Sequence, residues 1–500
     1  IIPLFGSVPQ FSFNLTIRYF QKGDIFMKYF SKTKIGSLVL AFLMICLLPS
    51  CGGETGKSGS TSSAEEEKID LTKDMGNYDF VFASHWAASV FPEKGSSATA
   101  DLIWKRVEEI QTRNNCKISY KGGTPEEYLQ NMQVASASGV KYADVVLTNL
   151  WWYRGYQDTD YFVPWNDIEG INIDASKWIP SITKVATELD GKTYGLDFHS
   201  WPDRMLDISN TMFFNKNLLE KYNQPDPYEL AEKGEWTWEN LRTICKNLTK
   251  DLDGDKQNDI WGLISNDRVL EYSAIRSNGC FEVEVDNKGL YTVGFQNEKA
   301  YKAMEFVRDL IHVDRVAYEK NELASFPIFK EGRAGFVSIG SVATRWKGYL
   351  SEMEDDYGFI WFPQGPDNQG GKYYGSSLSG DSQVFCITQG ADDPQKAGYI
   401  FNLLTEPLEG KSVDSWKDYA LKNYFRNDKQ AFDNYLMLRD TAVFDYGPIL
   451  GYGSYNSLRD AIYSVTRDQA MTPAQAMESV TGSINEQLKE RWELTVNAES

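Results

Sequence analysis

The sequence is poor in the residues and motifs on which many enzyme active sites depend. It has three histidines among 500 residues, and their spacing matches no HExxH or related metal motif. It also has no GxSxG segment and no P-loop, so serine hydrolases and nucleotide hydrolases lack their minimal parts. The shortage of histidine also argues against a zinc receptor.

Basic residues are outnumbered by acidic ones. The chain has 51 Lys and Arg against 70 Asp and Glu, for a formal net charge of −19. A negative field of this size repels nucleic acid and anionic lipid head groups. We therefore expect no nucleic-acid partner, and we take most of the acidic residues to be solvated surface.

Cysteine is also scarce, with six residues and no CxxC pair. A metal cluster is thus disfavoured. Cys46 lies in a predicted signal peptide and Cys51 is a predicted lipid attachment site. In an exported protein the other four leave three disulfide pairings open, but we expect free buried thiols: Cys116, Cys245, Cys280 and Cys386.

The only long hydrophobic run lies near the beginning of the sequence. Residues 27–50 have a basic start, an apolar run from Ile35 to Leu48 and then Pro49-Ser50-Cys51, which is the order of a secretory signal peptide. Leu48-Pro49-Ser50-Cys51 resembles the lipobox of bacterial lipoproteins, and this resemblance implies acylation of Cys51. The alternative is an ordinary signal peptide with a chance cysteine. Residues 51–73 are a Gly, Ser and acidic tether. We expect residues 1–26 not to be translated in vivo. Codons for Lys22-Gly23-Asp24 can form a purine-rich ribosome-binding site just ahead of Met27, which would then be the start.

From residue 77 onward, strand patterns alternate with helical ones. We predict strands at 77–85, 116–121 and 142–150, and helices at 98–114 and 125–139 between them. This alternation indicates parallel βαβ units in a doubly wound α/β sheet. Ligands of such sheets bind beside the carboxyl ends of the strands, which places the loops 84–86 and 149–153 at the predicted site.

Several segments follow one another in a familiar order. They are ADVVLTNLWW, DGKTYGLDF, NTMFFNKNLLEKY, GEWTWENLRTICKNLTKD, FKEGRAGFVSIGS and YGFIWFPQGP. Together they resemble the extracellular solute-binding proteins of bacterial ABC importers, in particular the sugar-binding family that includes maltose-binding protein. The resemblance covers about residues 77–495.

The resemblance implies a two-lobed periplasmic-binding-protein-like fold of type II, with a doubly wound sheet in each lobe. It also implies three hinge crossings, which we place near 196–204, 376–383 and 444–451. Lobe 1 is then 74–201 with 382–443, and lobe 2 is 202–376 with 450–495.

The candidate ligand residues combine aromatic rings, which suit the C–H faces of a sugar, with polar groups that suit its hydroxyls. The resemblance places an aromatic platform at Trp151 and Trp152, and because adjacent side chains diverge we expect one of them to face the ligand. Trp86 ends the first strand at the family's first ligand loop. The other matched positions are Trp201, Asp203 and Arg204 at the first crossing, and Tyr272, Ser341, Trp346 and Tyr455 on lobe 2, with Tyr374 as a weaker match.

The stretch DLDGDKQNDIWG at 251–262 is similar to a calcium loop. An EF-hand-type loop takes oxygens from positions 1, 3, 5, 7 and 9, here Asp251, Asp253, Asp255, Gln257 through its carbonyl, and Asp259. The usual Gly at position 6 and the acid at position 12 are missing. The sequence leaves open a structural calcium ion and an acidic surface turn, which favours the same residues.

The predicted function is therefore capture of a mono- or oligosaccharide and its delivery to ABC permease subunits. We expect a lipid-anchored monomer on the outer face of the cytoplasmic membrane, no catalysis and no required cofactor. The alternatives are the same fold with a polyol, a glycerophosphodiester or a peptide, and a lipid-anchored glycoside hydrolase, for which no motif supplies the paired carboxylates.

Overall fold

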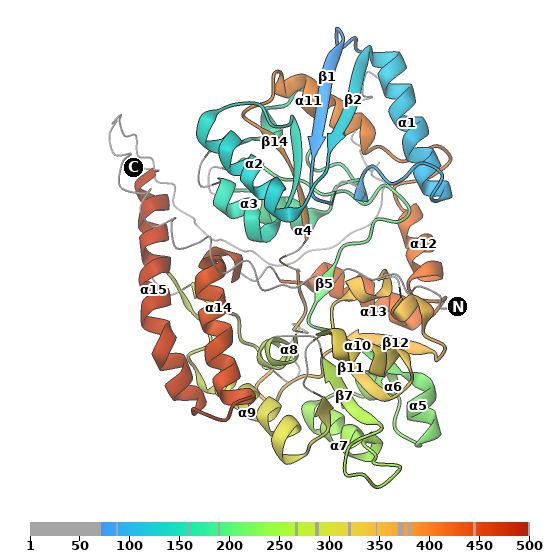
Figure 1. Cartoon of the computed structure of the whole chain (residues 1–500), viewed down its shortest axis with the longest axis vertical. Coiled ribbons are helices and arrows are strands. Elements are labelled where there is room, and N and C mark those ends of the chain that lie inside the picture. The colour runs from blue at the N-terminus through green and yellow to red at the C-terminus, as the bar shows by residue number, and fades with distance from the viewer. Residues whose placement is uncertain are drawn as a thin grey trace, which may run out of the picture. The chain divides into compact units, whose positions relative to one another are not determined.

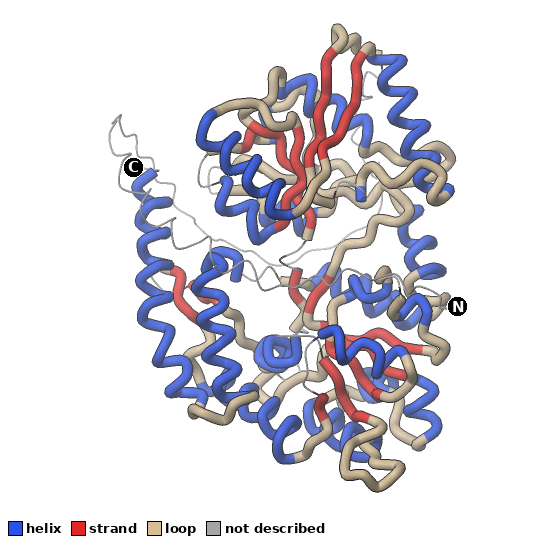
Figure 2. Tube along the Cα trace, in the orientation of Figure 1, coloured by secondary structure: helices blue, strands red, loops and turns tan. Residues whose placement is uncertain are grey.

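Two mixed sheets, each flanked by helices, organise the computed structural model (Figure 1). The structure describes residues 72–498 apart from 87–88, 158–159, 189–190, 266–268, 286–289, 319–321, 347, 369–374, 379, 381 and 444–446. Both sheets lie within the compact unit Ala64–Trp492. Figure 2 shows the strands of each sheet between helices, which confirms the α/β class.

The first sheet has the strand order β2-β1-β3-β14-β4. β1 runs parallel to β2 and β3, whereas β14 is antiparallel to β3 and β4. The strands are β1 (Tyr78–Ala83), β2 (Cys116–Lys121), β3 (Val145–Asn149), β4 (Phe162–Val163) and β14 (Gln383–Thr388). The helices of this part are α1 (Ala98–Asn114), α2 (Pro125–Ser138), α3 (Leu150–Gln157), α4 (Pro180–Val185) and α11 (Pro394–Leu404).

Local signals explain where α1 and α2 begin. The Ser97 hydroxyl accepts a hydrogen bond from the Ala100 N–H at the start of α1. Thr124 and Glu127 form a reciprocal capping box at the start of α2, which is followed by Pro125 at the first helical position. The apolar stripe of α1 is buried against the sheet. The predicted bounds of α1 and β2 are confirmed, and those of α2 differ by one residue.

The second sheet has the order β10-β7-β11-β6-β12. Its strands are β6 (Thr211–Asn215), β7 (Trp261–Ser265), β10 (Ala317–Tyr318), β11 (Ala334–Ser338) and β12 (Tyr357–Trp361). Its helices are α5 (Lys216–Lys221), α6 (Pro227–Glu232), α7 (Trp238–Leu248), α8 (Val269–Ser277), α9 (Glu298–Arg308) and α10 (Glu322–Lys330). A π-helical turn, 309–313, extends α9. The central strands β6 and β11 are buried along their whole length, as expected for strands covered on both faces.

The C-terminal part adds helices to the second sheet. α14 (Gly447–Thr466) packs against α9, and α15 (Pro473–Ala498) follows it. The hairpin of β8 (Val283–Val285) and β9 (Tyr291–Val293) is tied to α15 by a hydrogen bond from the Val293 N–H to Asn485 Oδ1 (2.8 Å). Short 3-10 turns occupy 165–167, 341–344 and 350–352.

The connections between the two sheets lie side by side in a small sheet of their own. β5 (Ile208–Ser209) pairs antiparallel with β13 (Ser377–Leu378), and Val443 forms a parallel bridge with Ser377. The chain passes from the first sheet to the second through β5 and returns through β13, near the first two predicted crossings.

One part of the predicted lobe assignment is wrong. We placed residues 382–443 in lobe 1, but α12 (Ser415–Asn423) and α13 (Lys429–Thr441) belong to the core of the second sheet. Phe359 of β12 contacts Phe425 and Tyr435, with ring centroids 5.6 and 6.4 Å apart. The last passage between the sheets therefore lies between α11 and α12, ahead of the predicted 444–451, because the apolar faces of α12 and α13 pack on β12.

Among the described residues, no helix combines the length and the apolar character needed to cross a bilayer. The predicted signal peptide, the lipidation site Cys51 and nearly all of the tether lie outside the described residues, as does Tyr374. The four remaining cysteines are free, and three of them are buried. The expectation of free thiols is thus confirmed, although Cys116 is only half-buried.

Candidate functional site

The ends of β1 and β3 bring a group of aromatic rings together. Trp86 follows β1, and Trp152 lies in the first turn of α3, directly after β3. Their rings are nearly parallel, with an interplanar angle of 10° and centroids 6.2 Å apart. His85 lies beside both, at 3.7 Å from Trp86 and 5.1 Å from Trp152, and Tyr128 of α2 lies 6.3 Å from Trp152. We call His85, Trp86, Tyr128 and Trp152 the first aromatic group.

His85 is the polar member of the first aromatic group. Burial lowers the pKa of its imidazole to about 4, so the ring is neutral at pH 7. Its Nδ1 atom is buried and accepts or donates no hydrogen bond within the described part of the chain. A buried polar atom without a partner costs free energy unless a ligand or water satisfies it. Within the described residues, His85 therefore holds an unsatisfied polar atom at this end of the sheet.

Local hydrogen bonds fix the start of α3. Asn149 ends β3, and its Oδ1 accepts a hydrogen bond from the Trp152 N–H (2.9 Å). The N–H groups of Leu150 and Trp151 donate to the carbonyls of Ser382 and Gly380 (3.2 Å each). We predicted a loop at 149–153; instead α3 begins at Leu150, because Asn149 caps it. The helix fixes the directions in which the two tryptophans point.

Trp151 points away from Trp152 and joins a second set of rings. It meets Tyr455 of α14 edge to face, with centroids 4.8 Å apart at 65°. Tyr455 stacks on Tyr272 of α8 (5.7 Å, 27°), and the Arg276 guanidinium lies 5.5 Å from the Tyr272 ring centre. Trp151, Tyr272 and Tyr455 form the second aromatic group. The second aromatic group thus combines elements of both sheets, and α3 carries one tryptophan of each group.

A buried polar network lies under the second aromatic group. Arg276 Nη2 donates to Glu282 (2.5 Å), and its Nη1 donates to Ser377 Oγ of β13 (2.9 Å). Asn210 Nδ2 donates to the same hydroxyl (2.8 Å). The charge of Arg276 is therefore balanced by a buried carboxylate, which argues against a role for Arg276 in holding an anionic solute.

The residues predicted at the first crossing are used within the protein. Trp201 is 1% exposed and packs edge to face on Phe198 (4.9 Å). The Arg204 guanidinium lies over the Phe198 ring (4.1 Å) and binds Asp197 and Gln383, so it ties the first connection to β14. The Asp203 carbonyl accepts a hydrogen bond from Tyr424 (3.2 Å), and burial raises the pKa of its carboxyl.

Two further predicted positions also serve packing. Ser341 is fully buried, and its hydroxyl accepts a hydrogen bond from the Ile208 N–H of β5 (3.0 Å). Trp346 is half-buried and packs on Phe326 and Tyr349, with centroids 5.2 and 6.3 Å away. Neither contact joins them to the aromatic groups.

The acidic loop at 251–259 is folded mostly on its own backbone. Asp251 accepts hydrogen bonds from the N–H groups of Gly254 and Lys256, and Asp259 accepts one from Leu252. Asp251, Asp253 and Asp259 each present a carboxylate oxygen within 4.8 Å of the others. Asp255, also predicted as a ligand, instead accepts hydrogen bonds from the N–H and Nε2 of Gln257 (2.7 and 3.1 Å).

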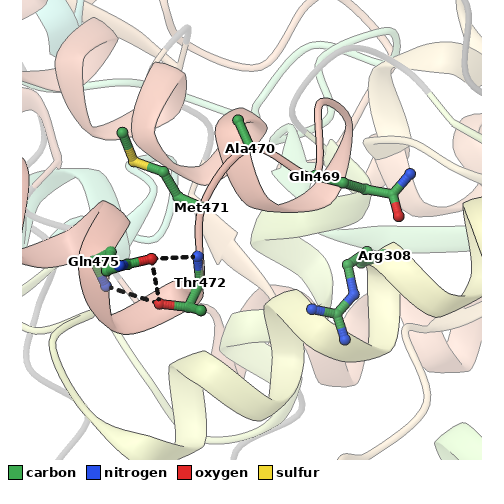
Figure 3. A pocket seen from close by; sticks show the side chains of 6 residues that line it. All are labelled: Arg308, Gln469, Ala470, Met471, Thr472 and Gln475. Atoms are coloured by element: carbon green, nitrogen blue, oxygen red, sulfur yellow. Dashed lines mark hydrogen bonds between the residues drawn. The ribbon is translucent and has the colours of Figure 1, made fainter.

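A surface pocket of about 370 Å³ lies elsewhere, between the end of α9 and the turn that joins α14 to α15 (Figure 3). Figure 3 shows Arg308 on one side and the capping pair Thr472 and Gln475 on the other, where Gln475 Oε1 accepts hydrogen bonds from the Thr472 N–H and hydroxyl (3.1 and 3.0 Å). It contains no member of the two aromatic groups. Its open, polar lining gives no reason to prefer it as the solute site.

Tyr128 and Gly380 were not predicted at the site, and Asn149 was predicted as part of a loop there but not as the cap of a helix. Asn149 carried a usable signal, because Asn is a preferred helix cap and stands directly between a strand and a double tryptophan. Tyr128 is a helical residue whose partners come from two other elements, and the contact of Gly380 with Trp151 depends on the fold.

Comparisons with known proteins agree with this architecture. A family model described as "Bacterial extracellular solute-binding protein" matches residues 92–409. A search of curated proteins by sequence found no match.

Similar solved structures span most of the chain. They include the GacH receptor of Streptomyces glaucescens, studied unliganded and with acarbose (17% identity, 83% of this chain and 99% of that chain, TM-score 0.57). The cyclic α-maltosyl-1,6-maltose binding protein of Arthrobacter globiformis is similar over 83% of this chain and all of its own (15% identity, TM-score 0.59). UgpB of Mycobacterium tuberculosis, in complex with glycerophosphocholine, is similar over 83% of this chain and 99% of its own (14% identity, TM-score 0.57). At these identities the likeness shows a shared two-lobed fold.

Proposed function

Because the chain belongs to the family of bacterial extracellular solute-binding proteins, we propose that it captures a mono- or oligosaccharide and delivers it to the permease subunits of an ABC importer. The observation that carries the proposal is the pair of aromatic groups that α3 brings together: Trp152 meets Trp86 after β1, and Trp151 meets Tyr455 of α14, which stacks on Tyr272 of α8. A solute that touches both sets of rings binds both lobes and so favours their closure.

The chemistry of the two aromatic groups suits a sugar. Flat aromatic rings offer large rigid surfaces for C–H faces at a small cost in side-chain entropy. The Nδ1 atom of His85 and the Ser382 hydroxyl, both buried and unpartnered within the described residues, are polar points that hydroxyl groups can satisfy. We propose Trp86 and Trp152 as the main platform, with Trp151, Tyr272 and Tyr455 as the aromatic residues on the side of the second sheet. Trp201, Asp203, Arg204, Ser341 and Trp346 support the fold around the site.

The remaining features of the proposal follow from the family and the leader sequence. We propose a protein exported through residues 27–50, anchored by a lipid on Cys51 and monomeric, with no enzymatic activity and no required cofactor. We propose lobe 1 as 74–201 with 382 to about 410, and lobe 2 as 202–376 with the helices from α12 onward. The lipobox supports the lipid anchor, and the net charge of −19 supports a monomer, because like-charged copies repel one another.

A thermal-shift screen tests the proposal. The chain from Gly52 onward, which contains every described residue, is heated with a panel of mono- and oligosaccharides, because a ligand that binds only the folded state raises the melting temperature. A rise with one sugar class supports a receptor and identifies its solute. Trp152→Ala should abolish the rise. Trp104→Ala is the matched control, since Trp104 is a half-buried tryptophan of the same lobe that contacts Phe91 and Tyr120.

A glycerophosphodiester is the second candidate, and two observations favour including it. The fold is shared with UgpB, and neutral aromatic rings also attract quaternary ammonium groups. Glycerophosphocholine therefore belongs in the panel together with a polyol and a short peptide. A shift with glycerophosphocholine and with no sugar would replace the carbohydrate assignment, and cleavage of a glycan on long incubation would replace it with a hydrolase.

We also propose that the acidic loop can hold a structural calcium ion. Asp251, Asp253 and Asp259 supply the carboxylates, hard oxygen ligands of the kind Ca²⁺ prefers, and the Gln257 carbonyl is the fourth predicted ligand. Calcium should raise the melting temperature of the wild type and not of Asp253→Asn with Asp259→Asn. An equal effect of calcium on both proteins, or none on either, would leave the loop as an acidic turn.

A further inference from the structure

We infer that Trp151 is a positioning residue whose contact with Tyr455 latches α3 to α14 and holds the two lobes together before a solute binds. The inference rests on the two-lobed arrangement in the proposed function and does not depend on which solute binds. Trp151 and Trp152 then have different roles. Trp152 belongs to the solute platform, and Trp151 favours the arrangement in which the lobes are in contact over one in which they are further apart.

The first support is the way in which Trp151 is anchored on the first-sheet side. Its N–H donates to the Gly380 carbonyl (3.2 Å), so α3 is tied to the connection that enters β14. Its indole also lies directly against the same residue, since a Cβ atom on Gly380 would come within 2.0 Å of Trp151 Nε1. Only a glycine leaves room for the ring in this position.

The second support is the surface on which the indole is seated. Trp151 follows β3 of the first sheet, yet it packs against the core of the second sheet, whereas Trp152 packs against the first sheet's residues. Its partner Tyr455 is only 9% exposed and stacks in turn on Tyr272, which is 3% exposed. Trp151 is therefore a side chain of one lobe seated in the apolar surface of the other.

The strength of such a contact suits a latch that a solute can overcome. An edge-to-face aromatic pair shifts an equilibrium by a factor of about three to ten beyond the effect of buried area. A shift of this size favours one arrangement without locking it. The α8 helix that carries Tyr272 is itself held to the connecting strand β13 by the Arg276 hydrogen bond to Ser377 (2.9 Å), so the seat of the latch is fixed relative to the hinge.

The test measures the distance between the lobes in the absence of any solute. Spin labels are attached to Val134→Cys in α2 and Val313→Cys at the end of the π-helical turn, positions that are 59% and 68% exposed. Three native thiols are buried, and labelling of the fourth, Cys116, is removed by Cys116→Ser in every protein compared. Pulsed electron–electron double resonance should show one dominant distance between the two spin labels in the parent protein. Trp151→Ala should lower the population at that distance relative to longer ones by about three- to tenfold.

The matched control is Trp261→Ala. Trp261 is a half-buried tryptophan with the same kind of partner, an edge-to-face tyrosine (Tyr318, 4.9 Å, 71°), but both residues lie in the second sheet. This variant loses an equivalent contact within one lobe and should keep the parental distance distribution.

A second variant protects the inference if Trp151→Ala folds poorly. Gly380→Ala leaves the indole intact and displaces it, and it should change the distances in the same direction. Unchanged distances in both folded variants would refute the latch. Because no solute is used, that outcome is distinct from failure of the sugar screen, which would refute the proposed function and leave the latch standing.

Discussion

Protonation of His199 should weaken the folded protein below neutral pH. Its Nε2 lies 2.9 Å from the Ser176 carbonyl, which can only accept a hydrogen bond, and its Nδ1 lies 2.7 Å from Arg439 Nη2, which can only donate one. The neutral ring with hydrogen on Nε2 satisfies both partners. A second proton on Nδ1 would point at the Arg439 guanidinium. Burial, and next this guanidinium, lower the pKa of His199 from 6.5 to about 4.

The sign of the effect follows from proton linkage. Between pH 6.5 and 4 the unfolded chain binds a proton at this residue and the folded chain does not, so the free energy of unfolding falls as the pH falls through this window. One pKa unit corresponds to about 1.4 kcal/mol, so lowering the pH from 7 to 5 should cost about 2 kcal/mol through His199. Between pH 7 and 8 the contribution changes by less than about 0.2 kcal/mol.

The assay compares urea unfolding of the wild type and His199→Asn at pH 8, 7 and 5. Asparagine keeps an acceptor for Arg439 and does not titrate, so the loss of stability between pH 7 and 5 should be about 2 kcal/mol smaller in the variant. The interval from pH 8 to 7 is the internal control, in which the difference between the two proteins should change by less than about 0.2 kcal/mol. Equal losses between pH 7 and 5 in both proteins would refute the reasoning.

Three further predictions follow from packing and burial. Arg426→Met should lower the free energy of unfolding by about 3 kcal/mol in urea titrations. The reason is that the guanidinium donates hydrogen bonds to the carbonyls of Leu350, Met353 and Asp355 (2.7, 2.6 and 3.0 Å). A change below about 0.5 kcal/mol, the size typical of surface substitutions, would contradict this prediction. Gly262→Ala should lower the melting temperature, since its Cβ would meet Cys245 Cβ at 2.5 Å, whereas Gly482→Ala in α15 has open space and should not. Thiol reagents should react slowly with the native chain from Gly52 onward and fully with the unfolded one, since burial raises the pKa of Cys116 and Cys280 to about 11; rapid native labelling at pH 7 would show that these thiols are accessible.

The parts of the fold that could be predicted from the sequence are those specified by neighbouring residues. The bounds of α1 follow from the Ser97 cap and an apolar stripe at helical spacing, and the meeting of Trp86 with Trp152 follows because parallel strands end at the same edge. The family resemblance added the two lobes and the order of the segments.

The parts that could not be predicted depend on distant partners. The amphipathic pattern of α13 says that one face is buried but not which sheet buries it, so its assignment to the first lobe was wrong. An aromatic residue suits a core and a sugar equally well, and sequence alone could not separate the buried Trp201 from the half-buried Trp152. The seat of Trp151 depends on how α3 emerges from β3.

The place of β14 in the first sheet has a consequence for biosynthesis. This strand pairs with β3 on one side and β4 on the other, although more than 200 residues separate it from either. An N-terminal fragment that ends before Gln383 leaves both strands without their central partner, and closing so long a loop is slow. The first lobe therefore completes its sheet only after most of the second lobe has been synthesised, and the chain remains incompletely folded during the interval in which an exported protein must thread through a narrow channel.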